Sequence, residues 1–291
     1  MTAAESVAEQ VARLLEVGWL AKSKCSALLR QKLGPLLAAG VIVEDRFGAG
    51  RRLVVRDLAA LRTFQLKEFP DCPLPADTAT RVLGVARFRD SKTFPNDTPV
   101  IVSVRAWRED AFRKEGQPTE AAAATARHGA FCVLLENDSS YSVHGACALV
   151  ENPIVFARFE SLGLPVGLVF YGQGRISNRV LDWLGRTAGT DFTLLHLPDY
   201  DPAGLNEFER IRSRLGTRVR LHLPDHLSRA FEQFANRHLL ESPNSQAMLA
   251  ALRGLGSAET QQVLELIHRH NGGLEQEALL ATPPSGRPAR P

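Results

Sequence analysis

Residues 145–201 decide the fold, and they read GACALVENPIVFARFESLGLPVGLVFYGQGRISNRVLDWLGRTAGTDFTLLHLPDYD. Short apolar runs in this stretch alternate with segments whose apolar residues recur at helical spacing, and the alternation continues to residue 222. Alternation of this kind is typical of parallel strands joined by crossover helices. We therefore predict an α/β fold over residues 144–282, with a mostly parallel sheet and helices on both of its faces. The predicted strands are 145–150, 166–170, 192–197 and 217–222, and the predicted helices are 153–162, 176–187 and 203–214.

Polar motifs follow three of these predicted strands. Glu151 follows the first strand, Gly172-Gln173-Gly174 the second, and Asp199-Tyr200-Asp201 the third. Ligands of parallel sheets bind at the carboxyl ends of the strands, so the three motifs should converge on one crevice. Carboxylates at the ends of buried strands are costly to desolvate unless a cation lies among them, and Mg²⁺ prefers oxygen ligands. The pattern predicts a divalent metal site.

Several of these residues also have a structural interpretation. Asp201 precedes Pro202, which is the arrangement of a helix N-cap followed by proline at the first helical position. The glycine motif suits a plain strand-to-helix turn as well as a close approach of backbone to phosphate. Arg175 follows that motif at a predicted helix start and is a candidate phosphate contact. His196 lies within a predicted strand, where a core position is the simpler interpretation.

The first 68 residues follow the order of a winged helix. Apolar spacing predicts a helix over 5–17, a second helix that begins at Ser23, and a third that ends before Gly40. Strands at 41–43 and 52–56 flank a glycine-containing turn, which predicts a hairpin. We predict a winged-helix domain over residues 1–68.

Positive charge is concentrated in this region. Between Lys22 and Lys67 there are ten Lys and Arg residues against three acidic ones, a local excess of +7, whereas the whole chain carries only +3. Such an excess suits a surface that faces phosphates. The alternative is a solvated helical domain that holds a partner protein. The candidate DNA contacts are Lys22, Lys24, Arg30, Lys32, Arg51, Arg52, Lys92 and, in the C-terminal half, Arg175.

Residues 69–143 are the least patterned part of the chain. The proline-rich segment Pro70–Pro75 predicts a linker. Strands at 100–107 and 131–135 and a helix at 119–128 follow, and they form either a small second domain or an elaboration of the third. The tail, 283–291, is rich in proline and lacks an apolar face, so we expect it to be disordered.

Composition excludes several classes of protein. No run of about 18 apolar residues occurs and no basic-then-apolar leader is present, so we expect a cytoplasmic protein without membrane spans. The four cysteines form no Cys-x-x-Cys pair, which argues against a structural zinc site and against a disulfide framework. The C-terminal histidines share no ligand spacing with cysteine either.

Five motifs, taken in their order along the chain, resemble a known family. A glutamate after the first strand, a glycine turn after the second and Asp-x-Asp after the third is the Toprim pattern. The fuller order resembles the JetD/MksG nuclease subunits of Wadjet plasmid-defence systems, a family related to the A subunit of topoisomerase VI. The resemblance covers roughly residues 145–280, and the winged helix fits it too. Its motifs are Val150-Glu-Asn152, Gly172-Gln-Gly174, Trp183-Leu184, Asp199-Tyr-Asp-Pro-Ala-Gly204 and Leu274-Glu-Gln-Glu277. The segment Phe88-Arg-Asp-Ser-Lys92 is similar to a further element of that superfamily.

The resemblance implies a Mg²⁺-dependent DNA endonuclease, with Mn²⁺ as a possible substitute. Glu151, Asp199 and Asp201 would be its metal ligands, and Glu275 and Glu277 would complete a two-metal site unless they belong to a surface helix. It also implies double-stranded DNA as substrate, a homodimer, and an SMC-type ATPase complex as partner. The sequence has no Gly-x-x-x-x-Gly-Lys-Ser/Thr loop, so any ATP use would come from partners.

The three tyrosines bear on the reaction. Topoisomerases of the related kind attack DNA with a tyrosine of their winged-helix domain. Tyr141, Tyr171 and Tyr200 all lie beyond residue 140, so a covalent mechanism lacks its nucleophile and hydrolysis by activated water remains. Two alternatives stay open. One is a DNA-binding scaffold whose Toprim-like domain does not cut. The other is another Toprim enzyme, although primases usually carry zinc fingers and overcoming-lysogeny-type nucleases carry their own ATPase.

Overall fold

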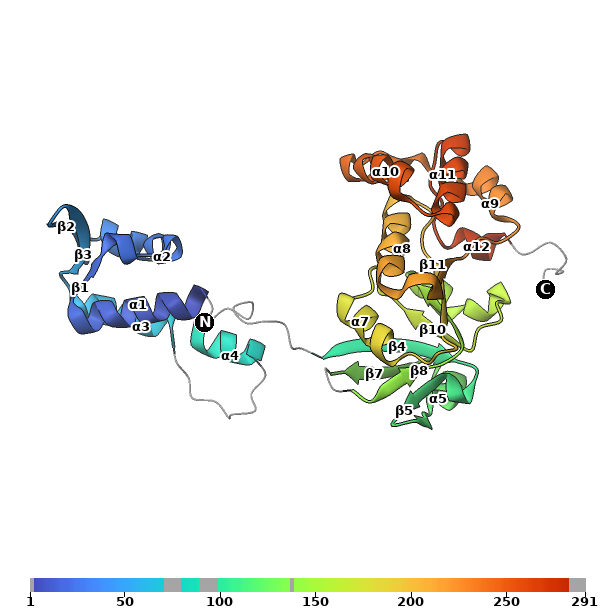
Figure 1. Cartoon of the computed structure of the whole chain (residues 1–291), viewed down its shortest axis with the longest axis horizontal. Coiled ribbons are helices and arrows are strands. Elements are labelled where there is room, and N and C mark those ends of the chain that lie inside the picture. The colour runs from blue at the N-terminus through green and yellow to red at the C-terminus, as the bar shows by residue number, and fades with distance from the viewer. Residues whose placement is uncertain (1–2, 71–79, 89–98, 137–138, 283–291) are drawn as a thin grey trace. The chain divides into compact units, whose positions relative to one another are not determined.

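The computed structural model describes residues 3–70, 80–88, 99–136 and 139–282 of the 291-residue chain. The chain divides into two compact units, Met1–Thr98 and Pro99–Pro291 (Figure 1). The predicted linker, from residue 71 on, and the predicted disordered tail lie outside the described residues.

The N-terminal unit packs four helices with a small antiparallel sheet. Its strand order is β1-β3-β2, and its core is a single cluster of buried apolar side chains. A two-residue turn joins β2 to β3, with Gly48 in the left-handed region at φ +57°, so the predicted hairpin is confirmed. The elements are α1 (Ala3–Val17), β1 (Trp19–Ala21), η1 (Lys22–Lys24), α2 (Ala27–Ala38), β2 (Ile42–Phe47), β3 (Gly50–Val55), α3 (Leu58–Glu68) and α4 (Thr80–Phe88).

The prediction of separate second and third helices is wrong. Ser23 lies inside the 3₁₀ turn η1 and does not begin a helix, and one continuous helix, α2, replaces both predicted helices. Ser26 caps α2, because its Oγ accepts the Leu29 N–H at 3.1 Å. Pro35 lies inside α2 without ending it, and the chain leaves the helix at Gly40, where φ is +71°. The cap at Ser26 rather than at Ser23 therefore moves the start of the helix.

The C-terminal unit is built on a six-stranded sheet with the order β12-β11-β9-β10-β4-β7. The four strands β12, β11, β9 and β10 run parallel, and β4 and β7 are antiparallel additions. The mixed α/β class and the mostly parallel sheet are thus confirmed. The strands are β4 (Val100–Ala106), β7 (Phe131–Leu135), β9 (Ala146–Val150), β10 (Leu168–Tyr171), β11 (Thr193–Leu197) and β12 (Val219–Leu221).

Crossover helices connect the parallel strands. The connection from β9 to β10 moves one way across the sheet, and the connections to β11 and β12 move the other way. Right-handed crossovers therefore place α6 on one face and α7 and α8 on the other, as the ribbon also shows (Figure 1). Because the loops after β9 and β11 leave toward opposite faces, a crevice opens between these adjacent strands at their carboxyl ends. The helices are α6 (Pro153–Ala157), α7 (Asn178–Thr187), α8 (Pro202–Leu215), α9 (Leu227–Phe234), α10 (Pro243–Leu255), α11 (Ala258–His270) and α12 (Ala278–Ala281), with 3₁₀ turns η3 (Phe159–Leu162), η4 (Gly216–Arg218) and η5 (Arg237–Leu240).

The middle of the chain belongs to this second unit from Pro99 on. Strands β4 and β7, predicted at 100–107 and 131–135, extend the main sheet. Of the two predicted alternatives, this segment is therefore an elaboration of the C-terminal domain and not a separate small domain. The remainder forms a three-stranded sheet with the order β6-β5-β8 beside a short helix. These elements are η2 (Glu109–Ala111), β5 (Phe112–Lys114), β6 (Gln117–Pro118), α5 (Ala121–His128) and β8 (Tyr141–Val143). Among the described residues, no helix combines the length and the apolar character that a bilayer crossing requires.

Candidate active site

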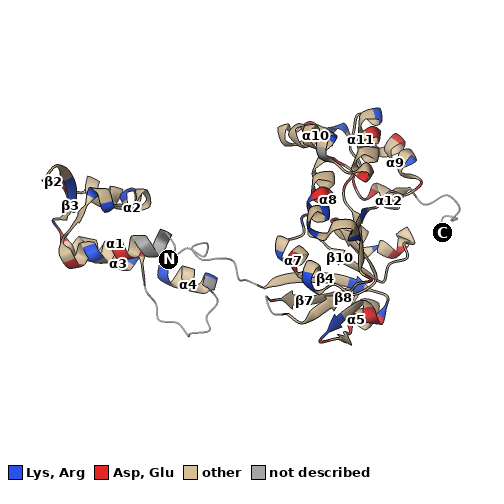
Figure 2. Cartoon of the chain, viewed as in Figure 1, with Lys and Arg blue, Asp and Glu red and all other residues tan. Residues whose placement is uncertain are grey.

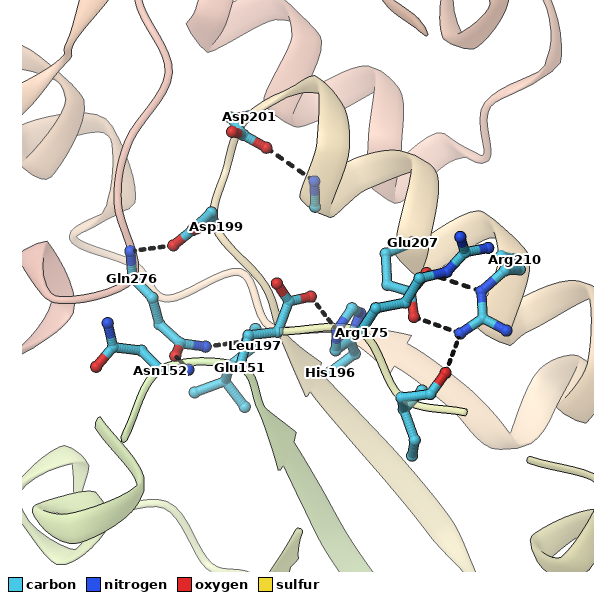
Figure 3. Close-up of polar contacts among 12 residues, drawn as sticks. Glu151, Asn152, Arg175, His196, Leu197, Asp199, Asp201, Glu207, Arg210 and Gln276 are labelled. Atoms are coloured by element: carbon cyan, nitrogen blue, oxygen red, sulfur yellow. Dashed lines mark hydrogen bonds and ion pairs between the residues drawn. The ribbon is translucent and has the colours of Figure 1, made fainter. Parts of the chain in front are cut away.

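Three predicted acidic residues lie together at the carboxyl edge of the sheet. Glu151 directly follows β9, and Asp199 and Asp201 follow the neighbouring strand β11, whose Leu197 pairs with Val150. Figure 3 shows their side chains beyond the ends of the two strands. The prediction that parallel strands bring these residues together is confirmed.

The two aspartates are held by backbone N–H groups. Asp199 Oδ1 accepts the N–H of Gln276 at 2.7 Å. Asp201 Oδ1 accepts the N–H of Gly204 at 2.8 Å, and Asp201 is the N-cap of α8, with Pro202 at the first helical position. The helix-cap interpretation of Asp201 is therefore confirmed. Both carboxylates are fixed in place by main chain rather than neutralised by cationic side chains.

The electrostatics of the site disfavour ionised acids. Burial raises the pKa of Glu151 to about 8, and the nearby charges of Glu207 and Asp201 add to the shift. Burial also raises the pKa of Asp199 to about 6, against the opposing hydrogen bond from Gln276. The pKa of Asp201 is raised for the same first reason. These carboxylates gain stability from a proton or from a cation among them.

The segment 274–277 lies beside the two aspartates. Its Leu274 pairs with Tyr200, between the two aspartates, through two backbone hydrogen bonds of 2.8 and 3.0 Å. Gln276 is fully buried, and its side chain joins the two strands. Its Oε1 accepts the Asn152 N–H at 2.9 Å, and its Nε2 donates to the carbonyl of Leu197. Sequence reasoning named the glutamates on either side and missed Gln276, although an uncharged residue between two acids in a buried segment is a usable signal.

The two glutamates flank this buried glutamine. Glu277 is half-buried, and its Oε1 accepts a hydrogen bond from Asn152 Nδ2. Its charge contributes to the raised pKa of Asp199, and the charge of exposed Glu275 contributes to that of Asp201. The structure thus brings both predicted glutamates to the rim of the carboxylate group.

The glycine motif follows β10, the strand that pairs with β9 on the side opposite β11. Gln173 and Gly174 adopt left-handed backbone conformations at φ +53° and +83°. A Cβ at Gly172 would lie 3.3 Å from the carbonyl of Val150, so the chain passes close to β9 here. Beyond the motif, exposed Arg175 pairs with buried Glu207 at 3.2 Å, and Arg210 pairs with the same carboxylate. Arg175 is therefore a cation at the border of the site.

The predicted DNA contacts of the N-terminal unit divide into two groups. Four are paired with acids: Lys22 and Arg51 with Glu44, Lys32 with Glu68, and Arg52 with Asp45. Arg52 also lies over the rings of Trp19 and Phe47, 5.7 and 5.0 Å from their centroids.

The other two predicted contacts, Lys24 and Arg30, are exposed, and no described acidic side chain pairs with either of them. Figure 2 marks in blue the Lys and Arg positions along α2 and the β2–β3 hairpin. Lys92 lies outside the described residues.

The donor set fits a hard divalent cation. Oxygen ligands with raised pKa values suit Mg²⁺, and the buried Oε1 of Glu151 has no hydrogen-bond partner among the described residues. In the described part of the chain, no three His, Cys, Asp or Glu side chains already stand in ligand geometry around one point. Ion binding would therefore draw these carboxylates together.

Comparisons of the chain with protein-family models, with curated proteins and with solved structures returned no match.

Proposed function

We propose that this protein is a metal-dependent DNA endonuclease that hydrolyses phosphodiester bonds. The observation that supports it best is the group of acids from three separate segments at one sheet edge, with burial raising the pKa of Glu151, Asp199 and Asp201. Structural acids usually face a cationic partner, whereas no arginine or lysine pairs with these three in the described residues. A site of this kind favours a divalent cation over solvent.

Each part of the site has a role in the proposed reaction. Glu151, Asp199 and Asp201 would hold Mg²⁺ or Mn²⁺, and Glu275 and Glu277 at the rim would serve a second ion. The bound metal would supply Lewis acidity toward a phosphate oxygen and lower the pKa of an attacking water. Arg175 would contact a phosphate beside the scissile bond, where its guanidinium offsets the charge of the DNA backbone.

The N-terminal unit supports a role in binding double-stranded DNA. We propose that it is a winged helix and that the C-terminal unit is a Toprim domain, as the resemblance to JetD/MksG subunits implies. The further expectations from that family are a homodimer, a cytoplasmic location and an SMC-type ATPase complex that presents the DNA.

The test is cleavage of supercoiled and linear plasmid by the purified protein with Mg²⁺, Mn²⁺ or EDTA. Wild-type protein should cut only with metal, and Asp199→Ala and Glu151→Gln should lower the rate at least about 100-fold, since each removes a ligand. Arg186→Ala, which changes a surface arginine of α7 away from the acids, should cut normally.

If the variants cut like wild type, these acids are not the catalytic site. Metal binding and DNA binding without any cutting would favour the scaffold instead, and the same assay with SMC-type partners would separate scaffold from inactive subunit.

A further inference from the structure

A histidine lies buried beneath the carboxylates. His196 is on β11, and its side chain is fully shielded from solvent. Its ring stacks on Phe208 of α8, with centroids 6.1 Å apart and planes inclined by 20°. Packing alone explains an aromatic ring at this position, as the sequence predicted. Packing does not account for the two polar nitrogen atoms that this ring buries.

The polar atoms of this ring face one acid. His196 Nε2 lies 3.3 Å from Oε1 of Glu151 (Figure 3). Both ring nitrogens and this Oε1 are buried, and none of the three atoms has a hydrogen-bond partner among the described residues. Buried polar groups are almost always hydrogen-bonded because leaving them unpaired is costly. Nε2 and Oε1 are the two that can satisfy each other.

The imidazole can supply the hydrogen bond that the carboxylate lacks. A neutral imidazole carries one N–H and can place it on either nitrogen. With the proton on Nε2, the ring donates to Oε1 of the carboxylate that a bound cation would keep ionised.

We infer that His196 is a positioning residue that holds Glu151 for metal binding by donating from Nε2 to Oε1. This inference rests on the proposed metal site. The bond occupies one carboxylate oxygen, and the other oxygen of Glu151 points toward the aspartates (Figure 3). His196 thereby fixes the rotamer of a ligand that comes from the strand next to its own. Partners of this kind orient ligands in many metal sites, and their loss typically lowers metal affinity 10- to 100-fold.

The test measures Mn²⁺ binding to the full-length protein without DNA, by electron paramagnetic resonance of the free ion. His196→Phe keeps the ring and its stacking on Phe208 but removes the donor, and it should weaken Mn²⁺ binding about 10-fold or more. His196→Gln places an amide N–H near the Nε2 position and should restore affinity to within about threefold. His222→Phe is the matched control, because it changes the histidine that follows the next strand, β12, and should leave affinity unchanged.

Two results would overturn the inference in distinguishable ways. If wild-type protein and His196→Phe bind Mn²⁺ equally, the histidine does not position Glu151, and the metal site itself stands. If wild-type protein binds no Mn²⁺, the proposed metal site fails and this role fails with it. Should His196→Phe not fold by circular dichroism, His196→Gln against His196→Asn replaces it, because the shorter amide of asparagine does not reach Oε1. Equal affinities of those two variants would also contradict the inference.

Discussion

At the scale of single residues, Gln276 connects more of the candidate site than either glutamate beside it. Its backbone N–H holds Asp199, and its side chain links Asn152 to the end of β11. A buried amide with both ends occupied is costly to replace, because its partners are then left without hydrogen bonds. The glutamine therefore sets the spacing between the loop that carries Glu151 and the strand end before Asp199.

Replacing Gln276 by methionine tests this role. Gln276→Met keeps the approximate volume but leaves the Asn152 N–H and the Leu197 carbonyl unpaired, so unfolding should become easier by about 2–4 kcal/mol. Metal-dependent cleavage per folded molecule should fall as well, since Glu151 and Asp199 lose their common support. Gln261→Met is the control, because Gln261 also donates to a backbone carbonyl. It lies on α11 and donates to the carbonyl of Leu252 on α10. This variant should lower stability and leave cleavage per folded molecule unchanged, and an equal loss of cleavage in both would refute the special role of Gln276.

His222 should make the protein sensitive to acid. Burial lowers the pKa of its imidazole to about 4, and the neighbouring His226 contributes. The folded state thus resists protonation that the unfolded state accepts below pH 6.5, so the stabilisation is complete above pH 6.5 and is lost as pH falls toward 4. Urea unfolding of wild-type protein should show a loss on the order of 2 kcal/mol over this range. His222→Phe should remove this share of the loss and leave the share of His196, whose pKa burial also lowers, so an unchanged slope would contradict the assignment.

At the scale of elements, the first turn of α8 packs against the backbone of Asp199. A Cβ built on Gly204 would lie only 2.1 Å from the Asp199 carbonyl oxygen and 2.9 Å from Pro198. The same glycine donates to Asp201 Oδ1, so strand end, cap and helix meet within six residues. The final glycine of the Asp-Tyr-Asp-Pro-Ala-Gly motif is therefore a packing requirement.

Gly204→Ala should displace α8 from the strand end. We expect a loss of stability of about 2 kcal/mol or more, together with loss of cleavage, because overpacked sites force backbone shifts. Gly254→Ala is a matched control within α10, where an added Cβ meets no atom within 4 Å. That variant should be stabilised by about 0.5–1 kcal/mol. Thermal unfolding and the plasmid assay check both, and a neutral Gly204→Ala would show that the turn tolerates a side chain.

Element order was predictable from sequence in much of the C-terminal unit because β9, β10 and β11 are short apolar runs and α7 and α8 have capping side chains, Ser177 and Asp201. Strands β9, β10 and β11 and helices α7 and α8 were predicted at nearly their observed positions. In the N-terminal unit the predicted first helix matches α1, but the boundaries of the second and third were wrong, because Ser23 and Ser26 are both acceptable caps and only the fold selects Ser26. Local propensity predicts which residues can cap a helix, but tertiary contacts determine which of two neighbouring candidates does so.

At the scale of the whole molecule, the chain combines an α-helical unit that carries excess positive charge with an α/β unit that carries buried acids. Most of the predicted cations of the first unit are tied to acids of the same unit, and Arg52 is also packed on aromatic rings. The acidic partner offsets much of the positive charge in each pair, so these cations attract a phosphate only weakly. Lys24 and Arg30 are exposed and pair with no acid among the described residues, so their charge remains available to a phosphate.

Binding of a duplex should therefore depend most on Lys24 and Arg30. The double variant Lys24→Ala/Arg30→Ala should weaken binding, and it should lower the slope of log affinity against log salt by up to about 2, nearly one for each phosphate that the protein no longer neutralises. Fluorescence anisotropy of a labelled duplex at several salt concentrations checks this. Lys67→Ala, an exposed cation on α3, is the charge-matched control. Equal slopes for both variants would mean that the unit binds DNA elsewhere or holds a protein partner.

The sequence by itself determined the class of fold and the acids at the strand ends. Both follow from local rules, since apolar periodicity predicts strands and helices, and parallel connection brings carboxyl ends to one edge. The contacts of Gln276 and His196 became visible only in the folded structure. Each contacts atoms of residues that are distant along the chain. Asn152 and Gln276, which share a hydrogen bond, are 124 residues apart in the sequence. Because burial and partner geometry arise only when distant segments pack, no local pattern distinguishes such residues from ordinary core positions.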